Sequence, residues 1–332
     1  VVTGVQTCAL PIQILENPIA ILKYWQYDRD KWIIELWSES SALSKELITL
    51  QVPGVSRLSW RPDGKLLYYR QYQEGEHTVR GYLLESGKDT LILDSDELNP
   101  SLVISPDNKY RVSFTGHEIN ISRMDSAYSY NIPVSGMDIG NFVWSPDGNK
   151  IIYSDDLHPA QLFMLDIHSR EIKRVSGLDH YHSYNVSWAP DSKSIVYLVE
   201  EDRTDQHSIL YSYLFGHKLR KAFVRDKTYK RTLSWSPNGE YIAYIQYDYI
   251  DLIAYSTVWL VNQDGTKTKK IAELTGDVDK FQWTPDSKKL VLSMGQAFTP
   301  KVFILDVYSK EYRRLTKNSS DTYETDFAIW PG

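Results

Sequence analysis

Cysteine is almost absent from this sequence, and long apolar runs are missing altogether. The 332 residues contain one cysteine, Cys8, which lies in a segment that we interpret below as foreign to the protein. The rest of the chain therefore offers no disulfide, no thiolate zinc site and no cysteine nucleophile. No stretch approaches the ~20 apolar residues that a membrane-spanning helix needs, because the best run, residues 19–22, stops at Lys23. We expect no transmembrane segment.

An excess of basic residues is also missing. The 37 Lys and Arg are outnumbered by 43 Asp and Glu, and the net charge is −6. Phosphate backbones are normally bound by a basic face, so this balance argues against nucleic acid as a partner. With 42% hydrophobic and 24% charged residues, the composition is that of an ordinary globular protein. A chain of this length is either two domains or one repeat array.

The first twelve residues do not read as part of a natural protein. Residues 2–12 match the in-frame translation of a sequencing-library adapter, V-T-G-V-Q-T-C-A-L-P-I. We interpret residues 1–12 as an artefact and exclude them from the fold, because a segment foreign to the gene carries no information about it. We therefore expect the native N-terminus to be missing, so the compartment stays unknown from this segment.

One short motif recurs along the whole chain. An apolar strand that ends in Trp is followed by a turn of the form Ser-Pro-Asp-Gly, and from Pro62 to Pro331 the prolines of successive copies lie 40 to 48 residues apart. This period matches a four-stranded propeller blade of ~40–45 residues. The residues that we assign to this structural repeat are Trp60, Pro62, Asp63, Trp144, Pro146, Asp147, Trp188, Pro190, Asp191, Trp235, Pro237, Trp283, Pro285 and Asp286.

The turn residues have clear structural roles. Proline presets φ for the second position of a type I turn, Asp bonds nearby backbone amides, and Gly permits the left-handed exit. We therefore interpret the repeated aspartates as turn residues and the repeated tryptophans as packing between blades, rather than as a ligand site.

The repeat predicts an all-β propeller of four-stranded antiparallel blades, seven by our count, with six or eight left open. Helices should be few, because no long segment has a 3.6-residue apolar period. Residues 13–332 would form a single domain. A composite blade would take three strands from residues 19–51 and one from residues 326–332, which protects the sheet edges at both ends.

The unit Trp144–Asp166 closely resembles the TolB-type β-propeller repeat, and Trp283–Asp306 resembles it equally. The resemblance covers about residues 19–332. Propellers of this type occur in the periplasmic TolB component, in exported proteins, in prolyl-oligopeptidase-like peptidases and in oligogalacturonate lyase-like enzymes. The resemblance thus implies a bacterial protein of the periplasm or the cell exterior. The α/β domain that TolB itself carries has no counterpart in this sequence.

Familiar catalytic motifs are missing from the sequence. It has no Gly-x-Ser-x-Gly nucleophile elbow, no Gly-x-Gly-x-x-Gly and no Gly-Lys-Ser/Thr. His117-Glu118 lacks the second histidine of a zinc-protease helix. We therefore expect no catalytic residues and no cofactor, and the chain is more consistent with a binding protein than with an enzyme.

Two candidate sites remain. His180 and His182 are two apart in an extended segment, so both imidazoles could reach one metal at the mouth of the propeller; a third ligand would come from His158, His207 or His117. The alternative, which we favour, is a polar loop that holds no metal.

The second candidate is a set of loops that differ from blade to blade, at residues 71–78, 200–207 and 247–256. Loops of this kind carry specificity on a constant scaffold. In the last of them, Tyr247, Tyr249 and Tyr255 could form an aromatic contact surface. The alternative is local packing of a long loop.

Together these observations favour a non-catalytic scaffold that binds a protein or a small ligand at a loop-lined face. Two alternatives stay open. One is the propeller of a prolyl-oligopeptidase-like peptidase, which a reading frame continuing past Gly332 would support. The other is a metal-dependent lyase that uses His180 and His182.

Overall fold

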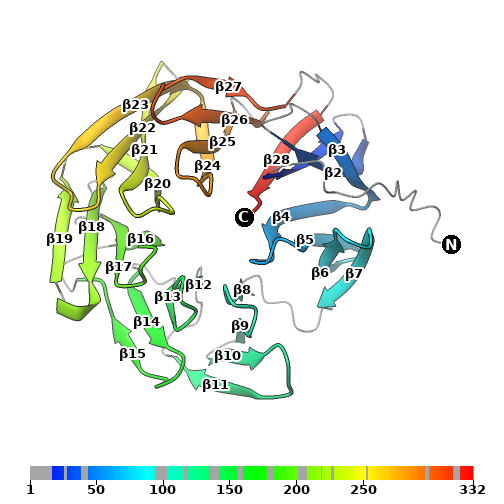
Figure 1. Ribbon diagram of the computed structural model, residues 1–332, viewed down its shortest axis with the longest axis horizontal. Coiled ribbons are helices and arrows are strands. Elements are labelled where there is room, and N and C mark those ends of the chain that lie inside the picture. The colour runs from blue at the N-terminus through cyan, green and yellow to red at the C-terminus, as the bar shows by residue number, and fades with distance from the viewer. Residues whose placement is uncertain are drawn as a thin grey trace. The chain divides into compact units, whose positions relative to one another are not determined.

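The chain folds into seven four-stranded antiparallel sheets, which are the blades of a β-propeller (Figure 1), as the computed structural model shows. The structure describes residues 17–25, 28–38, 44–93, 103–115, 118–134, 142–155, 160–177, 182–200, 208–217, 219–225, 228–251, 253–295, 299–316 and 322–331. Among these residues the helical structure is one short 3-10 turn, Phe215–His217. The prediction of an all-β propeller with seven four-stranded blades is confirmed.

Contacts within the chain divide it into two compact units, residues 1–98 with 278–332 and residues 99–277. The strands of the first unit are β1 (Ile19–Trp25), β2 (Asp28–Trp37), β3 (Ser44–Gln51), β4 (Gly54–Trp60), β5 (Leu66–Gln73), β6 (Glu76–Leu83), β7 (Lys88–Leu93), β24 (Asp277–Trp283, which begins at the boundary), β25 (Lys289–Gly295), β26 (Lys301–Asp306), β27 (Tyr312–Arg314) and β28 (Thr322–Ile329). They form three of the blades.

The second unit holds the other four blades. Its strands are β8 (Val103–Ile104), β9 (Tyr110–Thr115), β10 (Glu118–Arg123), β11 (Ser129–Pro133), β12 (Phe142–Trp144), β13 (Lys150–Ser154), β14 (Leu162–Asp166), β15 (Ile172–Arg174), β16 (His182–Trp188), β17 (Ser194–Glu200), β18 (Ile209–Leu214), β19 (Leu219–Val224), β20 (Tyr229–Trp235), β21 (Tyr241–Ile250), β22 (Ile253–Asn262) and β23 (Thr268–Thr275).

One blade combines strands from distant parts of the sequence. Strand β28 pairs antiparallel with β1, from Ile19 opposite Ile329 to Trp25 opposite Thr322, and the sheet order is β28-β1-β2-β3. The pairing begins at Thr322, four residues before the start suggested by the sequence motif. Both edges of β1 are therefore occupied, as sheet stability requires.

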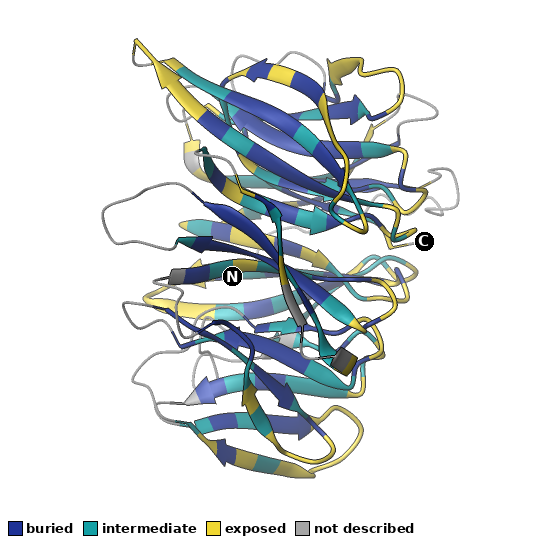
Figure 2. Ribbon diagram, turned by 90° about the vertical axis from the view of Figure 1, so that its left-hand side faces the viewer, coloured by how far each residue is buried: buried dark blue, intermediate teal, exposed yellow. Residues whose placement is uncertain are grey.

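Some middle strands of the blades, such as β13, β17 and β25, are buried on both faces (Figure 2). In β17, residues 195–199 are each fully buried. Ile195, Tyr197 and Val199 pack with side chains of the blade β12–β15, whereas Val196 and Leu198 pack with those of β20–β23. Alternate residues of a strand point to opposite faces, so a strand between two blades must be apolar at every position. This explains the unbroken apolar runs.

The Pro-Asp turns hold themselves together with their own side chains. The Ser145 hydroxyl donates to Asp147 Oδ1 at 2.6 Å, and the same carboxylate oxygen accepts from the Asn149 amide at 3.0 Å. Gly148 then has a φ of 71°. Ser192 and Ser287 occupy the corresponding left-handed position in other blades, each with a φ of 60°, where a non-glycine residue is strained.

The repeated tryptophans and turn residues lie in different environments. Trp60 is half-buried, whereas Trp144, Trp188, Trp235 and Trp283 are buried. The Trp188 indole nitrogen donates to the Val143 carbonyl of the preceding blade at 3.0 Å, and Trp60 donates likewise to Ala328 at 3.1 Å. The turn residues are exposed, namely Pro62, Asp63, Pro146, Asp147, Pro190, Asp191, Pro237, Pro285 and Asp286.

Candidate partner-binding hairpin

The hairpin β21–β22 is longer than the strands that flank it. Its two strands pair over ten positions, from Tyr241 opposite Asn262 to Ile250 opposite Ile253. The pairing of β20 with β21 stops at Tyr247, and the pairing of β23 with β22 stops at Tyr255. The end of the hairpin therefore extends beyond its own blade, and no strand among the described residues pairs with it there.

The three tyrosines that the sequence groups in this segment differ in exposure. Tyr247 is 3% exposed, and its ring lies 6.2 Å from that of Tyr229 and 5.3 Å from the Arg231 guanidinium. Tyr249 is 63% exposed. Tyr255 is half-buried and stands opposite Asp248. Of the three, only Tyr249 presents most of its ring to solvent.

One face of the hairpin end is an aromatic row with a charged pair beside it. Tyr247 and Tyr249 point to the same face because they are two residues apart. Arg231 Nη1 lies 3.1 Å from Asp277 Oδ2, and the Tyr249 hydroxyl donates to the same oxygen at 3.5 Å. Tyr249 is thus held at its hydroxyl while its ring stays free for contact.

The electrostatics of this face are determined mainly by the ion pair of Arg231 and Asp277. Partial burial lowers the pKa of Arg231, but the carboxylate of Asp277 together with Tyr229 and Tyr247 outweighs this effect, and the net pKa is raised. Burial, together with the same carboxylate, raises the pKa of Tyr249. At neutral pH the face therefore carries a charged guanidinium, a carboxylate and a neutral phenol that can donate a hydrogen bond.

The opposite face of the hairpin end carries an exposed aliphatic pair, beyond Asp248 and Tyr255 on the same face. Ile250 is 59% exposed and Ile253 is 42% exposed, and the two stand directly opposite each other across the strands. Sequence reasoning missed both residues. The available signal was a tight turn at Asp251 that lacks glycine and is flanked by isoleucine, where a solvent-exposed turn is normally polar.

The histidine candidates cannot be compared with the structure in the same way. His117, His158, His180 and His207 lie outside the described residues. His182 is the first residue of β16, and its backbone pairs with that of Glu200 in β17. Within the part of the chain that the structure describes, no group of three or more His, Cys, Asp or Glu side chains could hold a metal ion. The metal site stays a prediction.

The other two variable loops offer less. Residues 71–78 form the end of the β5–β6 hairpin, where Tyr72 is 39% exposed and its ring centroid lies 4.8 Å from that of His77, in a tilted arrangement. Residues 201–207 lie outside the described ranges.

Among the described residues, no helix is long and apolar enough to cross a bilayer.

Comparison with known proteins supports a TolB-like propeller. No family model matches the sequence. The Tol-Pal system protein TolB of Francisella tularensis subsp. tularensis (strain WY96-3418) is 22% identical over 236 residues, which are 69% of this chain and 53% of TolB. The chain thus spans about half the length of the curated relative it matches.

Solved structures show the same fold. The crystal structure of TolB from Acinetobacter baumannii is 14% identical with a TM-score of 0.58, and the match covers 95% of this chain and 67% of that one. An oligogalacturonate lyase in complex with manganese is 12% identical with a TM-score of 0.66, covering 92% of this chain and 88% of the lyase. At these identities the likeness is one of fold.

Proposed function

We propose that this chain is a non-catalytic, TolB-like scaffold that binds a protein partner, and that the end of the β21–β22 hairpin makes the principal contact. The observation that carries the proposal is the exposure of Tyr249, Ile250 and Ile253 at one projecting tip. Apolar side chains gathered at one exposed place are typical of interaction sites. Tyrosine is also among the residues that most often dominate binding energy.

The hairpin is suited to binding because most of it is already fixed. Ten paired positions set its register, and Tyr247 anchors its base against Tyr229 and Arg231. Tyr249 is further restrained through its hydroxyl. A contact that is ordered before binding loses less conformational entropy when the complex forms.

The comparisons and the sequence support the same role. The matched relative is named as a member of the Tol-Pal system, which fits a protein that works in an assembly. The sequence lacks the nucleophile elbow and the phosphate-binding loops of the common enzyme classes.

Site-specific photocrosslinking tests this proposal. A photoreactive amino acid is placed at position 250, and at Tyr308 as the control, because Tyr308 is also well exposed, at 58%, but lies on the β26–β27 hairpin. Any protein crosslinked in an extract of the native host is then purified, and its affinity for the whole chain is measured by calorimetry.

We expect one protein to be crosslinked from position 250 and not from position 308. Tyr249→Ala should weaken its binding about tenfold, equivalent to ~1.4 kcal/mol, and Tyr308→Ala should leave it unchanged. Equal crosslinking from both positions, or full affinity of the Tyr249→Ala variant, would contradict the proposal.

A further inference from the structure

Resting on the proposed function, we infer that the partner receives this hairpin in an apolar pocket edged by lysine or arginine side chains. The tip carries exposed apolar side chains on both faces, with Tyr249 on one and Ile250 and Ile253 on the other. A flat partner surface could cover only one of these faces at a time. Burial of all three side chains therefore needs a concave site on the partner.

Both charges within the tip itself are negative. Asp248 and Asp251 are exposed, and residues 245–256 contain no Lys or Arg. The carboxylate of Asp248 accepts a hydrogen bond from the Gln246 amide at 3.0 Å, which leaves its charge in place. These two aspartates form what we call the acidic collar of the tip.

The strands beside the tip do not offset this charge. On β20 and at the start of β24, Arg231 is paired with Asp277. On β23, Lys270 is paired with Glu273. Lys230 of β20 is fully buried and donates to the Ser208 carbonyl and the Thr228 hydroxyl, and Lys269 lies toward the other end of β23. Among the exposed charges that the structure describes next to the tip, the two aspartates of the acidic collar therefore stand in excess. A partner gains most from this surface if its own charges near the pocket are positive.

The same collar disfavours the two other occupants of an apolar tip. An anionic lipid surface attracts basic segments, and here it would meet two aspartates. A second copy of the chain, docked tip to tip, would place four like charges close together, and such juxtaposition opposes association. A basic-edged pocket on a different protein is the occupant that matches both the apolar side chains and the charge.

The experiment uses the full chain and the protein that crosslinks to position 250. Their affinity is measured at about 50 mM NaCl, where charge interactions between the two proteins are weakly screened, and at about 500 mM NaCl, where they are strongly screened. Asp248→Asn/Asp251→Asn removes the collar and keeps the shape, since Asn tolerates the left-handed φ of 50° at position 251. Ile250→Ser/Ile253→Ser removes the apolar face. Asp264→Asn is the charge control, because Asp264 is an exposed carboxylate in the turn at the other end of the blade.

We expect the Asn pair to weaken binding roughly fivefold at low salt and to match the wild type at high salt. The Ser pair should lose about tenfold at both salt concentrations, and Asp264→Asn should behave as the wild type. If the captured protein binds Asp248→Asn/Asp251→Asn as tightly as the wild type at low salt, this inference is overturned and the proposed function still stands. Failure to capture any protein overturns both.

Two further measurements separate the occupants. Cosedimentation with vesicles of phosphatidylcholine and phosphatidylglycerol should leave the chain in the supernatant, and sedimentation equilibrium should give a mass that Ile250→Ser/Ile253→Ser does not change. Vesicle binding lost in the Ser pair, or a dimer lost in it, would overturn the inference in favour of lipid or of a second copy.

Discussion

Gly64 is packed against the indole ring of Trp330, and its replacement by alanine should be unusually costly. The residue has a φ of 67°, and a Cβ atom there would lie 2.1 Å from Trp330 Nε1 and 2.7 Å from Cε2. The same indole nitrogen donates to the Gly64 carbonyl at 3.2 Å. Gly64→Ala would therefore force the indole away from the turn between β4 and β5.

A matched turn provides the reference value. Gly239 has a φ of 73° in the turn of another blade, and a Cβ atom there would lie 3.7 Å from Pro190, which is an ordinary contact. Gly239→Ala should cost only the strain of a left-handed alanine, about 1 kcal/mol. Gly64→Ala adds a lost hydrogen bond of about 1 kcal/mol and partial loss of indole burial of about 1 kcal/mol. We expect a total of about 3 kcal/mol.

Urea unfolding followed by circular dichroism would measure both variants, with the midpoints compared at unchanged slope. The cause is isolated by repeating Gly64→Ala in a Trp330→Ala background, where its cost should fall to that of Gly239→Ala. If Gly64→Ala costs no more than Gly239→Ala, or if its excess cost persists without the indole, the steric argument is refuted.

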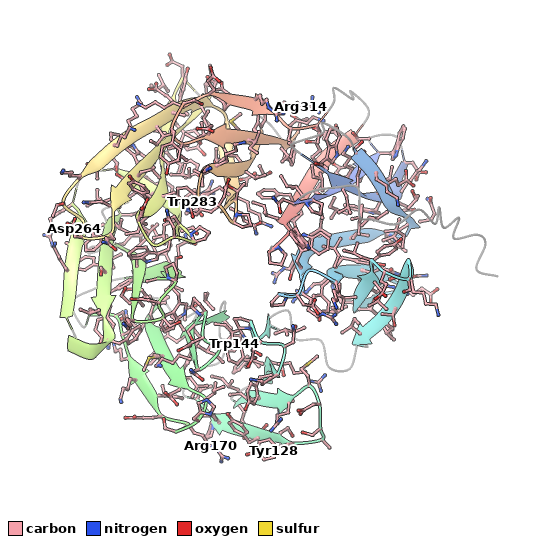
Figure 3. All side chains as sticks on the ribbon, viewed as in Figure 1. Tyr128, Trp144, Arg170, Asp264, Trp283 and Arg314 are labelled. Atoms are coloured by element: carbon pink, nitrogen blue, oxygen red, sulfur yellow. The ribbon has the colours of Figure 1, made fainter. Side chains whose placement is uncertain are left out.

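Three other predictions follow from the geometry. Burial raises the pKa of Asp147, but hydrogen bonds within its own turn outweigh burial and hold the pKa below its usual value. The ionised carboxylate therefore stabilises the folded state fully above pH ~4. This stabilisation is lost as the pH falls through the lowered pKa. Asp147→Asn should therefore flatten the acid side of a plot of melting temperature against pH, and an unchanged plot would contradict this. Arg170 has a φ of 61°, its guanidinium lies 4.4 Å from the Tyr130 ring, and it donates to the Tyr128 hydroxyl at 3.1 Å (Figure 3). Arg170→Ala and Arg170→Gly both lose these contacts, but only glycine relieves the strain of the left-handed backbone. In urea unfolding the Arg170→Gly variant should therefore be more stable than the Arg170→Ala variant by about 1 kcal/mol. Equilibrium dialysis against Mn²⁺ should give less than one ion per chain, whereas stoichiometric binding that His180→Ala abolishes would favour the lyase alternative.

The blades were predictable because their signal is local and repeated. A Pro-Asp turn after an apolar strand fixes one hairpin, and its recurrence about every 45 residues fixes the repeat unit. Fully apolar strands such as residues 195–199 indicate burial on both faces. The turn and the apolar strands recur in every blade, so the residues that surround each of them are themselves part of the repeat.

The exposure of the hairpin tip could not be predicted in the same way. Ile250 and Ile253 have the chemistry of core residues, and the strand pattern alone would bury them. They are exposed because β20 and β23 end before the hairpin does. Similarly, Tyr247 and Tyr249 share residue type and face, yet only Tyr247 is covered by Tyr229. Exposure here depends on where other strands stop.

The pairing of β28 with β1 sets an order for folding during synthesis. Strand β3 ends at Gln51, but β28 begins only at Thr322, so one edge of β1 stays unpaired while nearly all of the chain is made. Contacts this distant in sequence form slowly, and open strand edges invite association with other chains. The four blades of residues 99–277 have all their strands in one continuous segment and can assemble earlier. A chaperone that shields the edge of β1 would therefore protect the nascent chain at its most vulnerable point.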